Sequence, residues 1–220
     1  MVAQSLVLCS AGLDSAVLVA LEARTAEVQP AYVAVGLAWE AAERAALATL
    51  ATTDLFGGRV RPPVVLAFEM RDVYPRSHWA IRGVPPAYDT PDEDVYLDGR
   101  NVVLLAKAAV YASRAGIGRV ALGPLAGNPF PDATPRFFSA MSAALSLGLD
   151  RPMEIATPLA SMRKADVVKL GLELRVPLEL TLSCMNPQDG GRHCGACSKC
   201  RERHGAFVEA GVPDPTTYDK

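Results

Sequence analysis

The sequence predicts an α/β protein built on a doubly wound, mostly parallel five-stranded sheet, with a small cysteine-bearing appendage at its C-terminal end. Two observations support this prediction. Short aliphatic runs alternate with amphipathic helical stretches from the first residues onward, and four cysteines lie close together near the end of the chain. We expect the α/β domain to occupy residues 1–180, and the appendage, with a terminal helix, to occupy residues 181–220.

The expected strands are short enough to be buried parallel strands, and each is followed by a stretch with helical periodicity. Strands joined in this way run parallel and have helices on both faces of the sheet. Ligands of such sheets bind beyond the carboxyl ends of the strands. The strands are expected at residues 6–9, 30–36, 64–68, 118–123 and 153–157, and the helices at residues 16–21, 40–55, 102–113, 136–147 and 164–171.

Size and composition indicate a soluble protein with one full core. The chain has 220 residues and a mass of 23.3 kDa, and half of its residues are hydrophobic. No apolar run approaches the roughly 20 residues that span a bilayer, and residues 1–5 lack the basic region of a signal peptide. We therefore expect a cytoplasmic protein with no membrane contact. The net charge of −2 gives no general electrostatic reason to bind nucleic acid.

The turn after the first strand is suited to binding an anion. The strand stops at the small residues Ser10, Ala11 and Gly12. Asp14 and Ser15 follow, and both are N-cap types that precede a helix-forming run. In this arrangement free backbone N–H groups and the positive end of the helix dipole face one point, so phosphate fits there. The stretch is not a Walker A loop, because no Gly-Lys-Ser/Thr closes it, and it is not a dinucleotide fingerprint, because GxGxxG is absent.

Three further features have two interpretations each. Residues 71–97 form a long proline-rich irregular segment, which is either a functional loop or lid or a plain surface connection. Arg100 and Asn101 lie at a helix start beside a glycine, where they either reach a phosphate or carboxylate, or Asn101 simply caps the helix. Lys164 lies in the first turn of its helix, which is unfavourable for the helix dipole, so either a bound anion or solvent compensates it.

The four clustered cysteines have the spacing of a metal site. Cys184 is followed by nine residues and then by Cys194, Cys197 and Cys200, which form two overlapping Cys-x-x-Cys units. In a cytosolic chain such a cluster indicates a metal site rather than disulfides, and four thiolates close a tetrahedral shell around a structural zinc ion. An iron–sulfur cluster is a less favoured alternative, as is replacement of one ligand by His193. We therefore expect a zinc-binding appendage whose metal stabilises the C-terminal fold.

The anion-binding turn resembles the SGGxDS loop of the PP-loop ATP pyrophosphatases, with Ala11 in place of the first glycine. Four motifs in order then resemble the QueC family of 7-cyano-7-deazaguanine (preQ0) synthases along nearly the whole chain. The combination of a PP-loop with a C-terminal four-cysteine segment is more specific than either part. The motifs are SAGLDS at residues 10–15, YLDGRN at residues 96–101, TPL at residues 157–159 with KAD at residues 164–166, and the cysteines with the RER and AF segments that follow them.

The resemblance implies an ATP-dependent ligase that converts 7-carboxy-7-deazaguanine and ammonia to the nitrile, in queuosine biosynthesis. It also implies magnesium with the ATP, structural zinc and a homodimer. What it implies for single residues falls into four groups. Asp14, Lys164 and Arg100 act in catalysis; Cys9, Ser10, Ala11, Gly12, Leu13, Asp14 and Ser15 bind the nucleotide; Arg100, Asn101, Pro131 and Asp132 bind the substrate; and Cys184, Cys194, Cys197 and Cys200 bind zinc.

Two stretches depart from the family pattern. Residues 36–40 read GLAWE where the family has a YGQ-type segment followed by basic residues. Residues 125–133 keep Pro131 and Asp132 but lack the acids and the cysteine around a YPDC-like motif. Two alternatives therefore stay open: a QueC-like paralogue that adenylates a different carboxylate or transfers a deazaguanine to another acceptor, and a non-catalytic zinc-stabilised binding module. A sulfur-transferring enzyme is not favoured, because Cys9 lies in the expected buried strand.

Overall fold

The sheet is fully parallel and has five strands, which confirms the expected fold class. The computed structural model describes residues 3–219. The strands are β1 (Gln4–Leu8), β2 (Glu27–Ala34), β3 (Val64–Ala67), β4 (Arg119–Ala121) and β5 (Glu154–Ala156). Their order is β3-β2-β1-β4-β5, so the chain adds β2 and β3 on one side of the central β1 and β4 and β5 on the other. The direction of winding changes at β1, and this is where doubly wound sheets bind their ligands.

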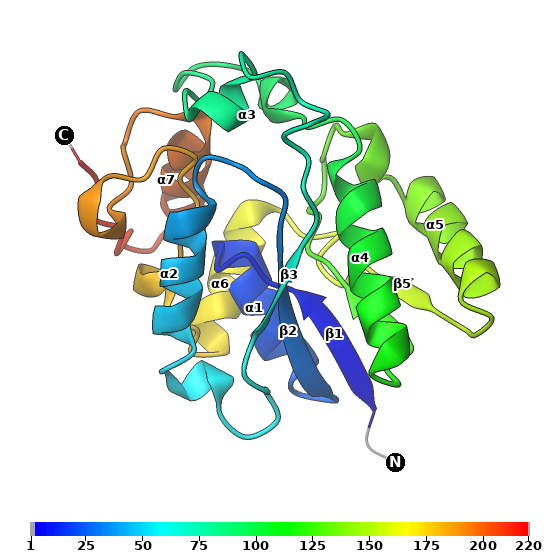
Figure 1. Ribbon diagram of the computed structural model, residues 1–220. Helices are drawn as coiled ribbons and strands as arrows, with labels where there is room; N and C mark the ends of the chain where they lie inside the picture. Colours follow the sequence, from blue (N-terminus) through cyan, green and yellow to red (C-terminus); the bar gives the residue numbers. More distant parts are fainter. Residues whose placement is uncertain (1–2, 220) are drawn as a thin grey trace.

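Helices cover both faces of the sheet, as Figure 1 shows. They are α1 (Leu13–Glu22), α2 (Glu40–Leu50), α3 (Trp79–Arg82), α4 (Arg100–Arg114), α5 (Pro135–Gly148), α6 (Lys164–Glu173) and α7 (Ser198–Ala210). Alternate residues of β1 face opposite ways: Val7 packs with α1, α2, α6 and α7, whereas Leu6 packs with α4 and α5. Both side chains are fully buried, which explains the unbroken aliphatic run. Within residues 3–219, no helix is long and apolar enough to cross a membrane.

Two of the differences between expected and observed bounds have a clear physical cause. β2 begins three residues before Pro30, which was expected to start it. Proline has no backbone N–H to donate, and the strand tolerates it here because pairing with β3 begins only at Ala31. Beside it, Gln29 Nε2 donates to the carbonyl oxygens of Pro30 (3.1 Å) and Pro62 (2.9 Å). α2 ends five residues before the expected residue 55, because the hydroxyls of Thr52 and Thr53 bond back to carbonyl groups of its last turn.

The C-terminal segment is built into the main core. α7 packs beside α6, and its residues Ala206 and Phe207 belong to the same buried cluster as α1. Arg203 of α7 is fully buried, and its guanidinium donates to Leu178 O (2.7 Å) and Thr181 Oγ1 (2.8 Å). These contacts join residues on both sides of residue 180. The division into domains 1–180 and 181–220 stays a prediction.

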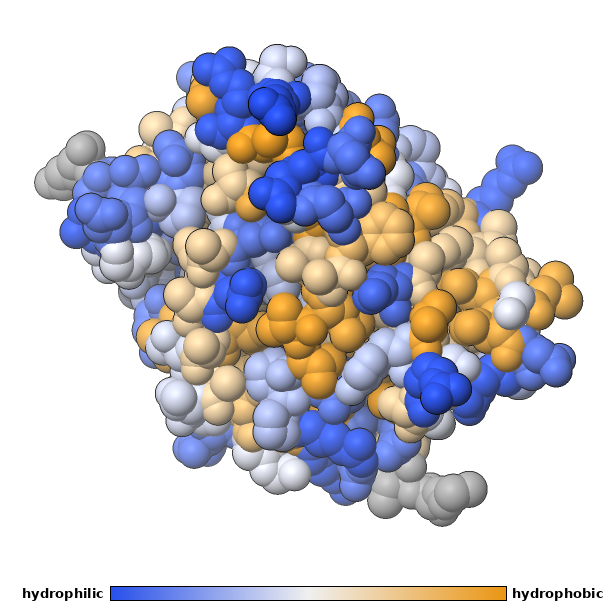
Figure 2. Space-filling model, in the orientation of Figure 1, coloured by the Kyte–Doolittle hydropathy of each residue, from blue (hydrophilic) through white to orange (hydrophobic). Residues whose placement is uncertain are grey.

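β3 forms one edge of the sheet and carries exposed apolar side chains. Figure 2 shows an apolar area near the centre of the face on which β3 lies in Figure 1. Val65 in β3 and Phe68 just after it are 51% and 44% exposed. An edge strand of this kind is a surface on which another chain can pair. The homodimer implied by the family resemblance stays a prediction.

Candidate active site

The loop after β1 has the geometry of an anion site. Gly12 is the N-cap residue of α1, and its backbone N–H donates to Ser10 Oγ (3.4 Å). Ser15 Oγ donates to Gly12 O (3.0 Å) and accepts the backbone N–H of Ser10 (3.3 Å). These bonds hold the loop in a tight turn at the positive end of the α1 dipole, where a phosphate group is stabilised.

Ala11 takes the backbone conformation that glycine would take in an SGGxDS loop. Its φ of 62° is in the left-handed region, which costs a residue with a Cβ roughly 1–2 kcal/mol. The surrounding structure compensates this cost, because Ala11 is fully buried and its carbonyl oxygen accepts the backbone N–H of Leu182 (2.9 Å). The turn therefore keeps its shape without the first glycine.

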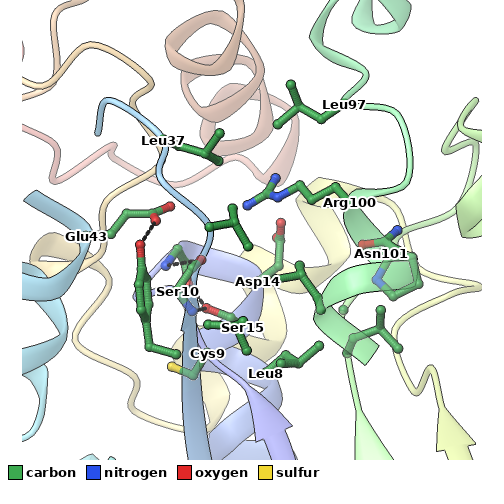
Figure 3. A pocket seen from close by; sticks show the side chains of 18 of the residues that line it. Leu8, Cys9, Ser10, Asp14, Ser15, Leu37, Glu43, Leu97, Arg100 and Asn101 are labelled. Carbon is green, nitrogen blue, oxygen red and sulfur yellow. Dashed lines mark hydrogen bonds between the residues drawn. The ribbon is translucent and has the colours of Figure 1, made fainter. Parts of the chain in front are cut away.

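A pocket of about 260 Å³ opens above this loop, at the carboxyl ends of the strands (Figure 3). Its walls come from the loop, the end of β2, α2, and two segments within residues 95–104 and 122–132. The structure thus brings together parts of the chain that are far apart in the sequence. Of the expected site residues, Cys9, Ser10, Gly12, Asp14, Ser15, Arg100, Asn101 and Asp132 line the pocket, whereas Ala11, Leu13, Pro131 and Lys164 are not among the lining residues.

Lys164 forms an ion-pair network with two carboxylates. Its Nζ lies 2.6 Å from Asp14 Oδ2 and 3.3 Å from Glu202 Oε1, and Glu202 also pairs with Lys199 (2.6 Å). Burial alone would lower the pKa of Lys164, but the two carboxylates outweigh it and raise that pKa. Burial would raise the pKa of Glu202, but Lys164 and Lys199 outweigh this effect and hold that pKa at about 2. Carboxylates from α1 and α7 therefore compensate the positive charge of Lys164, whereas the sequence suggested a bound anion or solvent.

Asp14 keeps one oxygen atom unused. Asp14 Oδ2 binds Lys164, but Oδ1 is buried and has no hydrogen-bond partner among the described residues. A buried carboxylate oxygen without a partner is costly, and a hard cation or a donor on a ligand would satisfy it. The atom therefore fits an oxygen ligand for a hard divalent cation.

Arg100 and Glu43 point toward the same space above the loop from opposite sides of the pocket (Figure 3). Arg100 begins α4, and its buried Nε has no hydrogen-bond partner in the part of the chain that the structure describes. Glu43 comes from α2, is 8% exposed, and accepts the hydroxyl of Tyr32 at 2.7 Å. Burial raises the pKa of Glu43 to about 7, although Arg100 and Tyr32 act in the opposite direction. The pocket thus combines a cation that has an unused donor with a carboxyl group that titrates near neutrality.

Asn101 and Asp132 hold each other at the start of α4. Asp132 Oδ2 accepts the backbone N–H of Asn101 (2.9 Å), and Asp132 O accepts the Asn101 amide (2.9 Å). Gly99 is the N-cap residue, and a carboxylate from a distant loop stabilises this helix end, so the interpretation in which Asn101 simply caps the helix is not supported. Tyr96 and Phe130 also line the pocket, and their ring centroids are 5.2 Å apart.

The four expected zinc ligands, Cys184, Cys194, Cys197 and Cys200, come together. Their sulfur atoms lie within 4.8 Å of one another, and the Cys194–Cys200 and Cys197–Cys200 separations are 3.9 and 3.5 Å. Zn–S bonds of about 2.3 Å in a tetrahedron require sulfur separations of about 3.8 Å, so these residues fit zinc. His193 is engaged elsewhere, because its Nε2 accepts the backbone N–H of Ser183 at 3.0 Å.

The irregular segment 71–97 connects the pocket with the cysteine segment. Its last residues, 95–97, line the pocket. Arg201 of α7 donates through Nη1 to the carbonyl oxygens of Tyr88 (2.7 Å) and Thr90 (2.9 Å). The last residues of the segment therefore belong to the wall of the site, which favours the functional interpretation over a plain surface connection.

Sequence reasoning missed Glu43, Tyr32 and Glu202. A signal existed for Glu43, because it shares one helical stripe with Leu47 and Leu50, and all three are buried. A charged residue on an otherwise apolar stripe is rarely buried without a partner or a task. No comparable local signal exists for Glu202, whose partner Lys164 lies on a different helix.

The fold and the site define a class of protein: an α/β domain with a phosphate-binding loop of the PP-loop type after its central strand. A solved 4-thiouridine synthetase–RNA complex with bound ATP has this fold, with a TM-score of 0.51 and 15% identity over 97% of this chain and 51% of that one. The chain belongs to the family of the queuosine biosynthesis protein QueC, whose model matches residues 4–211. This match confirms the family resemblance expected from the motifs.

Named relatives extend along nearly the whole chain. A 7-cyano-7-deazaguanine synthase of Methanothrix thermoacetophila is 36% identical, with 96% of each chain covered. One from Xanthomonas campestris pv. campestris is 32% identical, covering 98% of this chain and 97% of the relative. A third, from Thermoplasma volcanium, is 42% identical over 57% of this chain and 54% of the relative.

Proposed function

We propose that this protein makes 7-cyano-7-deazaguanine (preQ0) from 7-carboxy-7-deazaguanine and ammonia with ATP, in queuosine biosynthesis. The near-full-length relatives named for this synthase activity support the proposal. One structural observation supports it best: a phosphate-type loop and Arg100, with its unused buried donor, share one pocket. A triphosphate and a carboxylate would meet there. Neither the paralogue nor the non-catalytic binding module is favoured by these relatives.

The reaction needs ATP because a carboxylate would have to lose oxide to react with ammonia. Adenylation of the carboxylate, with loss of pyrophosphate, creates a good leaving group, and ammonia then displaces AMP to form the amide. A second adenylation, on the amide oxygen, allows AMP to leave and the nitrile to form. Negative charge grows on the phosphates in both adenylations, so the site requires cations and N–H donors rather than a protein nucleophile.

The loop and α1 are the proposed phosphate site. Ser10, Gly12 and Ser15 surround the N-terminus of α1, whose free N–H groups and dipole stabilise the pyrophosphate as it leaves. Asp14 Oδ1 would hold the magnesium ion, which supplies positive charge to the phosphates when bound. Lys164 holds Asp14 in position through the 2.6 Å ion pair and adds a second cation near the phosphates.

Arg100 is the proposed partner of the substrate carboxylate. Its guanidinium has the planar, multiple-donor geometry that carboxylates prefer. Asn101 and Asp132 bond to each other at the start of α4 and thereby keep Arg100 directed into the pocket. Tyr96 and Phe130 provide flat apolar surface beside it, on which a deazapurine ring can pack.

The proposed zinc ion is structural. Four cysteine ligands close its shell, so no position remains for a substrate. The ion would contribute folding free energy to the segment that ends in α7. That segment supplies Glu202 to the Lys164 network, and its Arg201 binds carbonyl groups of the irregular segment 71–97, so the metal supports the site from outside it.

A product analysis tests the function. The purified protein is incubated with ATP, magnesium, ammonium and 7-carboxy-7-deazaguanine, and nucleotides and deazapurines are followed by mass spectrometry. We expect two AMP for each nitrile formed. Asp14→Asn should lower AMP formation by roughly 10²-fold or more, whereas Asp54→Asn, at an exposed residue outside the pocket, should not change it. AMP without nitrile would indicate another acceptor, and no AMP from the folded wild-type protein would refute the proposal.

A further inference from the structure

The proposed reaction has a proton requirement that the residues assigned above do not meet. Ammonium enters with four N–H protons, and the nitrogen of a nitrile carries none. Two protons leave as the acyl adenylate becomes the amide, one leaves as the amide oxygen is adenylated, and one leaves as AMP departs from the imidate. A positioned base contributes typically 10²–10⁴-fold to such steps.

Three of the four acidic side chains that line the described pocket are already committed. Asp14 pairs with Lys164 at 2.6 Å. Glu40 Oε1 accepts two backbone N–H groups at the end of β2, at 2.6 and 3.0 Å, and Asp132 accepts a backbone N–H at the start of α4. These three carboxylates are thus held in place by a lysine or by backbone N–H groups. Glu43 remains.

Glu43 has the surroundings of a base that works near neutral pH. The hydroxyl of Tyr32 on β2 donates to it, Arg100 on α4 faces it across the pocket, Glu40 lies on its own helix, and the buried thiol of Cys9 follows β1. Burial is the main cause that raises its pKa to about 7; Glu40 adds to this effect, whereas Arg100 and Tyr32 oppose it. Both protonation states are therefore populated at neutral pH, as a group that takes and then releases protons requires.

We propose that Glu43 is the general base that removes N–H protons from the ammonia-derived nitrogen. This inference rests on the proposed function and names a further residue of the same site. Glu43 and Arg100 face the same space above the loop (Figure 3), so a carbonyl group held by Arg100 would lie in the space that Glu43 faces.

The step balances without any other reactant. The Glu43 carboxylate takes one proton from ammonium, which gives ammonia and the carboxylic acid form of Glu43. The nitrogen lone pair forms a C–N bond to the acyl carbon, and the C–O bond to the phosphate then breaks with its electron pair on AMP. Glu43 releases its proton to solvent and takes the second proton from the same nitrogen. The two protons lost in the second half of the reaction leave in the same way.

Tyr32 is a positioning residue in this scheme. Its hydroxyl donates to Glu43 Oε2 at 2.7 Å and holds the carboxyl group toward the pocket. Because this hydrogen bond also lowers the pKa of Glu43, its loss should raise that pKa further. Tyr32→Phe should therefore keep the base but move the acid limb of the ammonium-dependent rate to higher pH.

Glu43→Gln separates proton removal from adenylation. The amide keeps the shape of the side chain and cannot take a proton at neutral pH. Pyrophosphate exchange into ATP, measured with 7-carboxy-7-deazaguanine and without ammonium, should stay near the wild-type rate. Amide and nitrile formation from ammonium at pH 7 should fall by roughly 10²-fold or more. Hydroxylamine is mostly unprotonated at this pH, so the variant should still form the hydroxamate.

The pH profile provides the second measurement. The wild-type rate should fall as Glu43 becomes protonated below about pH 7, whereas the rate of Glu43→Gln should follow the concentration of free ammonia alone, with no break near pH 7. The deficit of the variant should shrink at alkaline pH, where free ammonia is abundant. Zinc content and thermal unfolding establish that the variants are folded.

Two results would overturn the inference. One is an ammonium-dependent rate of Glu43→Gln at pH 7 that equals the wild-type rate. The other is loss of pyrophosphate exchange and hydroxamate formation together with the ammonium reaction, which marks a structural role. A wild-type protein that shows no exchange with this carboxylate refutes the proposed function instead, so the two failures are distinguishable.

Discussion

Gly171 lies where α6 packs against α1, and its replacement by alanine is expected to be destabilising in an amount that the geometry sets. A Cβ atom there would lie 2.9 Å from Val17 Cγ2 and 3.0 Å from Leu178 Cδ2. Packed carbon atoms prefer about 3.5–4.0 Å, so both neighbours would have to move. Leu178 has little freedom to do so, because it is buried and its carbonyl oxygen accepts Arg203 Nη2 at 2.7 Å.

Gly205 in α7 is the matched control. It is exposed in the interior of a helix, and an added Cβ would meet nothing within 4 Å. Alanine gains about 0.5–1 kcal/mol of helix stability over glycine at either position. Only the change at residue 171 adds an overpacking cost, about 1–3 kcal/mol. Gly205→Ala should therefore stabilise the protein, and Gly171→Ala should be about 1–3 kcal/mol less stable than Gly205→Ala.

Urea unfolding of the zinc-loaded variants at pH 7, followed by circular dichroism, measures this difference. With a slope of about 2 kcal/mol per molar urea, a difference of about 2 kcal/mol separates the midpoints by about 1 M. Equal midpoints for the two variants would refute the reasoning, since they would mean that α6 and α1 can separate at Gly171 without cost.

Two further predictions concern the ion-pair network and the cysteines. Glu202→Gln removes a carboxylate whose pKa is lowered from 4.5 to about 2, so it should cost about 3 kcal/mol at pH 7. Because the pKa of Glu202 is lower in the folded state, the loss of stability in the variant should be complete above about pH 4.5 and should disappear toward pH 2. Urea unfolding of the zinc-free proteins at pH 7 and pH 3 measures this loss. An equal loss at both pH values would contradict the prediction. Cys197→Ser should lower the zinc content well below one ion per chain, as measured by atomic emission, and full occupancy would show that the four-cysteine assignment is wrong.

Features that depend on neighbours in the sequence were predictable. The aliphatic run before Ser10, the small residues after it and the helix-forming run that follows indicate strand, turn and helix by their local pattern, although Gly12 is the N-cap residue in place of the expected Asp14 or Ser15. The spacing of the cysteines likewise limits their arrangement to one compact cluster, and the structure confirms it. Alternation of strands and helices then implied a parallel sheet, because parallel strands need crossover connections.

The sequence by itself therefore determined the alternation of strands and helices, the tight turn after the first strand and the four cysteines that cluster. Only the tertiary structure decided how charges are compensated: Lys164 meets Asp14 and Glu202, and Glu43 becomes a buried acid opposite Arg100. The reason is physical. The energy of a charge depends on its burial and on partners supplied by other helices, and the packing of those helices is a property of the whole chain that no local stretch encodes.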